Sequence, residues 1–165
     1  MGLRYTNLDQ ATRSYMIAEF RLGNHYESSR LVPGGQACWL SLLAMALTNY
    51  DDYWLAKEAH RLSIFASVEN RKTRNGFRTV KVPENAPQTL AEGEFNHYYL
   101  RGIASRAINA NKTLRIYRGK FVDNPRWESE AMIGSTIDPR MLLAQLRTSP
   151  HDVFGPGSGL TCEIT

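Results

Sequence analysis

The run of residues 36–49, QACWLSLLAMALTN, constrains the fold more strongly than any other stretch of the sequence. Its apolar residues fall on every side of a helical wheel, which is typical of a helix enclosed by other elements. The run is interrupted by Ser41 and is too short to cross a bilayer. Because a chain of 165 residues has the size of one ordinary domain, the other residues must supply the layers that cover this central helix.

Four other segments repeat apolar residues at helical spacing, and three of them follow an aspartate that can cap a helix. The segments are 9–22, 53–68, 92–111 and the run that begins at Pro139, and the aspartates are Asp9, Asp51 and Asp138. Alternating residues predict a small mixed sheet formed by 77–82, 113–118, 133–137 and 160–164, with a turn at Asn75-Gly76. We therefore predict a helix-rich α+β fold.

We expect residues 1–165 to form a single domain. Its N-terminal part, about residues 1–70, is helical, its part at about 77–148 mixes helices and strands, and residues 149–165 form an extended tail with the string GPGSG. The predicted core takes large apolar residues from the inward faces of these elements: Trp39, Leu42, Leu43, Leu47, Leu62, Phe65, Phe95, Tyr99, Ile103, Leu142 and Leu146.

Positive charge is concentrated between residues 71 and 126. The chain has a net charge of +4, whereas this segment has twelve Lys/Arg and four Asp/Glu, a net charge of +8. Such a segment suits nucleic acid or an acidic protein face, and it is equally typical of a solvated surface. Tyr117 and Trp127 lie among its arginines, as in proteins that bind single strands, so residues 71–126 are an alternative site for nucleic acid.

The two cysteines, Cys38 and Cys162, are too few for a disulfide framework, and they form no Cys-x-x-Cys pair for a zinc ribbon. The N-terminal string MGLRYTNLDQ has no apolar stretch after a basic start, so we expect no signal peptide. GPGSG lacks the Lys-Ser/Thr of a phosphate-binding loop. We therefore expect a protein of a reducing cytoplasm with no membrane association, no cofactor and no bound metal.

Cys38 nevertheless supports an enzymatic alternative. The string Gln-Ala-Cys-Trp at the start of a helix resembles papain-like cysteine hydrolases, and a helix N-terminus favours the thiolate. In this reading His97 or His151 would be the base, oriented by Asn96 or Asp152. The family's longer Cys-Gly-Ser-Cys-Trp string is missing, and the alternative role of Cys38 is that of a small buried hydrophobic residue.

A second pattern suggests another enzyme family. Arg118, in the string IYRG, is followed along the chain by Ser135-Thr136 and then by Glu163. This order resembles the Arg, Ser-Thr-Ser and Glu pattern of ADP-ribosyltransferases. Only 47 residues follow Arg118, which is too few for the strands that this fold needs after its arginine. We therefore set this family aside.

The string NPRWESE at residues 124–130 places two glutamates beside arginines. Glu128 and Glu130 would share a face on a strand but not on a helix. Bidentate pairing with Arg118 and Arg126 would order the irregular loop 119–133. The predicted contact residues of the segment are Arg101, Arg115, Arg118, Arg126, Glu128 and Glu130.

From about residue 78 to the end, the chain resembles small virion-associated or assembly proteins of tailed bacteriophages. The likeness lies in FNHYYLRGIASRAI, LRIYRGK, PRWESEAMIGSTIDPRMLLAQLR and the Gly/Pro-rich tail. It implies a non-enzymatic structural role in the head or the head–tail connector, with other virion proteins or copies of the chain as partners. The implied location is the virion, and the host cytoplasm during assembly. No individual residue role follows from the resemblance.

Overall fold

The computed structural model describes residues 2–74, 76–155 and 157–165, which form six α-helices, one short 3₁₀ helix and five strands. The helices are α1 (Gln10–Arg21), α2 (Gly35–Asn49), α3 (Asp52–Arg61), α4 (Ala86–Ala110), α5 (Trp127–Met132) and α6 (Pro139–Thr148), and the 3₁₀ helix is η1 (Pro150–Asp152). The strands are β1 (Val68–Thr73), β2 (Gly76–Lys81), β3 (Leu114–Arg118), β4 (Thr136–Ile137) and β5 (Leu160–Ile164). The predicted helix-rich α+β class is confirmed. None of the helices in these ranges is long and apolar enough to cross a membrane.

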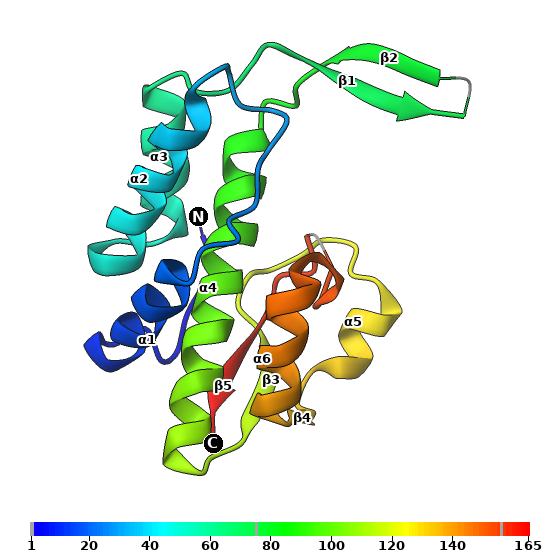
Figure 1. Ribbon diagram of the computed structural model, residues 1–165. Coiled ribbons are helices and arrows are strands. Elements are labelled where there is room, and N and C mark those ends of the chain that lie inside the picture. The colour runs from blue at the N-terminus through cyan, green and yellow to red at the C-terminus, as the bar shows by residue number, and fades with distance from the viewer. Residues whose placement is uncertain (1, 75, 156) are drawn as a thin grey trace.

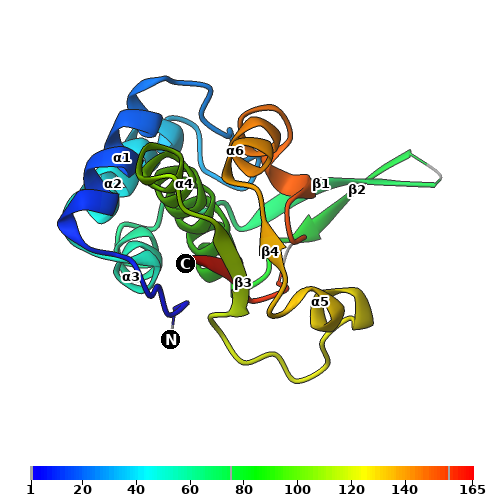
Figure 2. The same ribbon diagram turned by 90° about the horizontal axis from the view of Figure 1, so that it is seen from below.

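Helix α4 is the axis of the molecule. Helices α1, α2 and α3 lie on one side of it, and α6 and the sheet of β3, β4 and β5 lie on the other (Figure 1; Figure 2). The central position was predicted for residues 36–49, and this is wrong, because α2 has an exposed face that includes Met45, whereas α4 packs against α1 and α3 on one side and against α6 and β5 on the other. Helix α4 begins at Ala86 rather than near residue 92, because Pro87 fits the first turn of a helix.

The predicted helix caps are confirmed. Side chains of Asp9, Asp51 and Asp138 each accept a hydrogen bond from a main-chain N–H in the first turn of α1, α3 and α6. The helix predicted to run to residue 68 ends at Arg61, because the chain leaves the helix through Ser63 at φ 50°.

The three-stranded sheet has the order β4-β3-β5 and is antiparallel throughout rather than mixed. Strand β3 lies in the middle, and Ile116 faces Cys162 of β5 in the register. Leu160, Thr161 and Cys162 are buried, so the C-terminal residues are an inner layer of the fold. Residues 160–164 are therefore a strand, as predicted, and they pack against α4 in the chain's own core.

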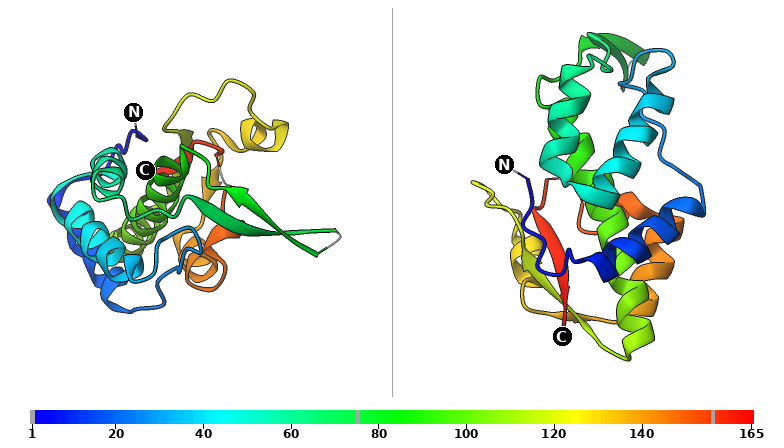
Figure 3. Two further views of the ribbon diagram at one scale, coloured as in Figure 1. Left: turned by 90° about the horizontal axis from the view of Figure 1, so that it is seen from above. Right: turned by 90° about the vertical axis from the view of Figure 1, so that its left-hand side faces the viewer.

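The β1–β2 hairpin, residues 68–81 and here termed the arm, projects from the end of the molecule near the start of α4 (Figure 1; Figure 3). Its strands pair with each other from Val68–Lys81 to Thr73–Gly76. Residues 77–82 were predicted to join the other strands in one sheet, which is wrong. A hydrogen bond from the Val82 N–H to the Ser67 carbonyl closes the base of the arm and directs it away from the body. Of the predicted turn, Asn75 lies outside the described residues.

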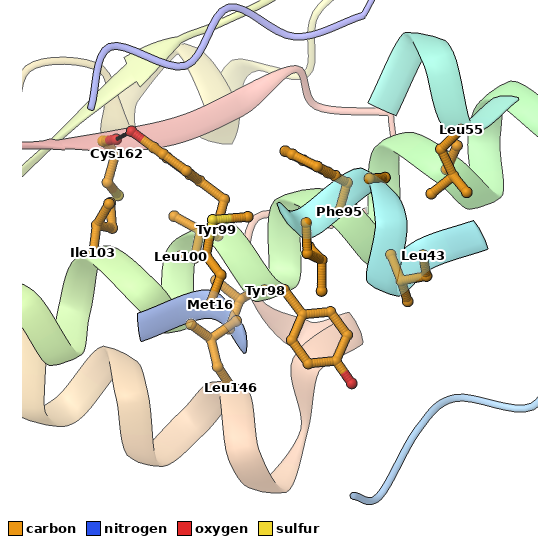
Figure 4. Packing of buried hydrophobic residues seen from close by; sticks show 14 of the residues in the cluster. Met16, Leu43, Leu55, Phe95, Tyr98, Tyr99, Leu100, Ile103, Leu146 and Cys162 are labelled. Carbon is orange, nitrogen blue, oxygen red and sulfur yellow. Dashed lines mark hydrogen bonds between the residues drawn. The ribbon is translucent and has the colours of Figure 1, made fainter. Parts of the chain in front are cut away.

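The core lies between the two layers and α4 (Figure 4). The Tyr99 hydroxyl donates a hydrogen bond to the Cys162 carbonyl at 3.1 Å and so ties α4 to β5. Nine of the eleven predicted core residues are buried. Phe65 is partly buried, and Leu62 is 40% exposed because α3 ends just before it.

Candidate functional site

A cavity of about 410 Å³ lies beside the N-terminal half of α4. Most of its walls come from three parts, the loop between α1 and α2, helix α4, and the segment that runs from η1 to β5, and Leu3 and, from the arm, Glu69 complete them. The three parts are far apart in the sequence, so the cavity exists only in the folded chain. Concave, partly polar cavities of this kind are the usual place for ligands.

Two histidines and a glutamate meet on the wall of this cavity. Glu94 and His97 are one turn apart on α4, and the His97 Nδ1 lies 3.4 Å from the Glu94 Oε1. His151 comes from η1, and its ring centroid lies 5.3 Å from that of His97 in an edge-on arrangement. Potential ligand atoms of the three residues all lie within 4.8 Å of one another.

Neighbouring aromatic and amide groups hold the cluster in position. The Tyr26 ring meets the His151 ring edge-on at a centroid distance of 4.7 Å. Asn96, next to His97 on α4, donates a hydrogen bond from Nδ2 to the Leu160 carbonyl at 3.0 Å. These contacts connect the α1–α2 loop, α4 and β5 around the cavity.

Gly155, Gly157, Ser158 and Gly159 of the GPGSG string form part of the cavity wall rather than a free linker, and Pro156 lies outside the described residues. Gly155, Gly157 and Gly159 all have positive φ, which side chains other than glycine rarely adopt. A Cβ on Gly159 would also lie 2.6 Å from the Lys120 carbonyl oxygen. These glycines therefore allow the chain to turn sharply between η1 and β5, with Gly159 close to the main chain of Lys120.

The structure separates the elements of the cysteine-hydrolase alternative. Cys38 lies in the first turns of α2, is partly buried and packs against the core. It is not among the residues that line the cavity, whereas His97, His151 and Asn96 are. The two candidate bases therefore meet Glu94 and each other. The position of Cys38 at a helix N-terminus, which suggested the cysteine-hydrolase alternative, gives no indication of the Glu94–His97–His151 group.

We predicted no metal ligands from the sequence and did not expect Glu94, His97 and His151 to form one group. The spacing Glu-x-x-His on a predicted helix was an available signal, since residues three apart share a face. The third member is 54 residues further along and lies in a 3₁₀ turn, so only the packing of η1 against α6 and α4 brings it to the cavity.

Arg101 was expected on a contact surface and is instead 7% exposed. Its Nη2 donates a hydrogen bond to the Leu146 carbonyl at 2.6 Å, and its guanidinium lies 5.1 Å from the centre of the Tyr98 ring. Burial of Tyr98 itself raises the pKa of its hydroxyl to about 12. Arg101 therefore joins α4 to α6 in the interior.

The other predicted contact residues are distributed over the sheet and α5. Arg115 pairs with Glu163 across β3 and β5. Arg118 pairs with Glu130 at 2.6 Å, which confirms the predicted pairing of this arginine with the 124–130 string. It also donates a hydrogen bond to the Ser158 carbonyl, so its guanidinium is engaged with the protein itself.

Residues 127–132 form helix α5 rather than a strand or an irregular loop. Glu128 and Glu130 therefore do not share a face, as they would on a strand. Arg126 precedes the helix and is exposed. It lines a second, smaller cavity of about 180 Å³ with Ser129 and Ser158.

Comparisons with known proteins do not add to this geometry. No family model, no curated protein and no solved structure matches the chain.

Proposed function

We propose that the protein is a non-enzymatic assembly protein of a tailed-phage virion, in the head or head–tail connector, and that the arm makes its main protein contact. The resemblance of residues 78–165 to such proteins supports the virion part of the proposal. The arm supports the contact part, because it leaves the body of the molecule with both strand edges and most side chains exposed (Figure 3).

Much of the unneutralised positive charge of the chain is on the arm. It carries five Lys/Arg and one glutamate, Glu69. Glu69 pairs with Arg30 of the body and with Arg71, and these arginines keep the pKa of its carboxyl below the usual value. Elsewhere in the basic segment, by contrast, Arg106 and Arg118 are paired with acids of the body. The arm thus offers a basic surface to a partner.

An exposed aromatic residue and free strand edges favour a protein partner over nucleic acid. Phe77 is 77% exposed on β2, and a large exposed aromatic residue is typical of an interface anchor. In the described residues β1 and β2 pair with each other alone, so each has an open edge that could accept a further strand. An isolated two-stranded hairpin is marginally stable in water, so a partner would also stabilise it.

The first test measures mass by size-exclusion chromatography with light scattering, for the protein alone and mixed with purified virion proteins. Phe77→Ser should weaken the complex by about tenfold or more, because it removes the anchor. Phe121→Ser is the matched control, since Phe121 is 82% exposed but lies outside the arm, and it should leave the complex unchanged. Equal effects of the two substitutions would contradict the role of the arm.

The second test asks whether the protein is present in purified phage particles, by mass spectrometry after gradient centrifugation. A strictly monomeric protein that is absent from particles would refute the proposed function. Binding of an oligonucleotide whose affinity falls steeply with salt and that is lost when Lys72, Arg74 and Arg78 are replaced by Glu would instead assign the arm to nucleic acid.

A further inference from the structure

We propose that Glu94, His97 and His151 form a site for a divalent transition metal, with Zn²⁺ as the expected ion. The three ligands lie outside the arm, and the proposal does not rest on the contact made by the arm. The site would attach η1 to α4 and present the metal to the 410 Å³ cavity.

The positions of the ligand atoms support the proposal. Two ligands come from one face of a regular helix, which fixes the Glu94–His97 separation at 3.4 Å. The third ligand, His151, comes from η1, and its ring already lies beside that of His97. With all candidate atoms within 4.8 Å, side-chain rotations alone can bring them to the distances of about 2 Å that zinc requires.

The charge of Glu94 supplies a second argument. Its side chain is 6% exposed, and the ion pair recorded for it in the described residues is with His97, a group that is charged only when protonated. An almost buried carboxylate is costly unless a cation or a proton compensates it. A bound divalent ion would compensate the carboxylate and use both imidazoles in their neutral form.

The donor set selects the type of metal. Two imidazoles and one carboxylate suit zinc and similar ions, whereas Mg²⁺ and Ca²⁺ prefer oxygen donors alone. Three protein ligands leave one position of a tetrahedral zinc ion open. That position would face the cavity, where it could take water or an oxygen donor of a small ligand bound near Ser28, Thr89 and Asn96.

Surrounding contacts would hold two of the ligands in place. The edge-on contact with Tyr26 limits the rotation of the His151 ring, and the hydrogen bond of Asn96 to β5 fixes the turn of α4 that carries His97. Outer contacts of this kind commonly tune metal affinity. The chain thus contains both the ligands and a support for them.

Isothermal titration of the metal-free full chain with ZnCl₂ tests the proposal. We expect one ion per chain and a higher melting temperature when zinc is bound, because zinc binds the folded state alone. His151→Ala and Glu94→Gln should each lower the affinity by about tenfold or more, and Mg²⁺ should not compete. His60→Ala is the matched control, since His60 is an exposed histidine outside the cluster, and it should leave binding unchanged.

Binding of Co²⁺ provides a spectroscopic readout of the ligand geometry, measured on variants whose far-ultraviolet circular dichroism matches that of the intact chain. The intact chain should give the visible absorption bands of a four-coordinate Co²⁺ site, and His151→Ala should lose them. The proposal is overturned if the intact chain does not bind zinc, or if His151→Ala binds it as tightly as the intact chain does. Loss of binding in His60→Ala alone would place the ion elsewhere and would also overturn it.

Discussion

The two glycines of α4 allow a sharp test of the packing between α1 and α4. At Gly102 an added Cβ would lie 2.6 Å from the Met16 Cγ, 3.1 Å from the Met16 amide nitrogen and 3.2 Å from the Thr12 carbonyl oxygen. At Gly93, nine residues earlier in the same helix, an added Cβ would meet no atom within 4 Å. The substitutions Gly102→Ala and Gly93→Ala therefore change the same residue type in the same helix and differ in what surrounds it.

The two substitutions are expected to change the free energy of unfolding in opposite directions. Alanine stabilises a helix interior by about 1 kcal/mol relative to glycine, so Gly93→Ala should stabilise the protein by up to about 1 kcal/mol. At Gly102 the same gain is opposed by overpacking against the main chain of α1, which typically costs about 1–3 kcal/mol. Helix α1 cannot move away freely, because Met16 is completely buried. We expect Gly102→Ala to destabilise the protein by about 1 kcal/mol.

Urea denaturation followed by far-ultraviolet circular dichroism measures both values. In a protein of this size about 1 kcal/mol corresponds to a change of about 2–4 °C in melting temperature, so a thermal scan provides a second measurement. The close approach of α1 to α4 would be refuted if Gly102→Ala were as stable as Gly93→Ala.

Three further predictions concern buried polar groups. Burial raises the pKa of Asp52 from 3.8 to about 6, so the folded state holds the proton of this carboxyl more tightly than the unfolded state does. The free energy of unfolding should therefore fall by about 3 kcal/mol as the pH rises from about 4 to about 6. Asp52→Asn should flatten this part of the stability curve, whereas the exposed control Asp123→Asn should keep it. Burial raises the pKa of the Cys162 thiol to about 12. A thiol probe at neutral pH should therefore label only the partly exposed Cys38 in the folded chain, and both cysteines in urea. Two rapidly labelled thiols in the folded chain would contradict the burial of β5. Arg101→Met should lower stability by about 1–3 kcal/mol, measured by urea denaturation, because a main-chain carbonyl of α6 loses its donor; an unchanged midpoint would contradict this role.

Local signals in the sequence determined most of the helices, most of the strands and most of the core, whereas helix α5 was not predicted. Aspartates at the starts of helices and Pro139 in the first turn of α6 act on their nearest neighbours, so their effect can be read from the order of residues. The apolar faces of α2, α4 and α6 follow the helical period in the same way. The pairing of Arg118 with Glu130 was also accessible, because the two residues are separated by a short loop.

Only the tertiary structure decided which helix is central, where the arm points and which residues line the cavity. Arg13, for example, donates hydrogen bonds to the last carbonyls of α2, more than thirty residues away. His151 similarly reaches Glu94 and His97 only after η1 packs beside α4. These contacts depend on the packing of distant segments, and neither the hydrophobic period nor local capping carries information about which distant residues will meet.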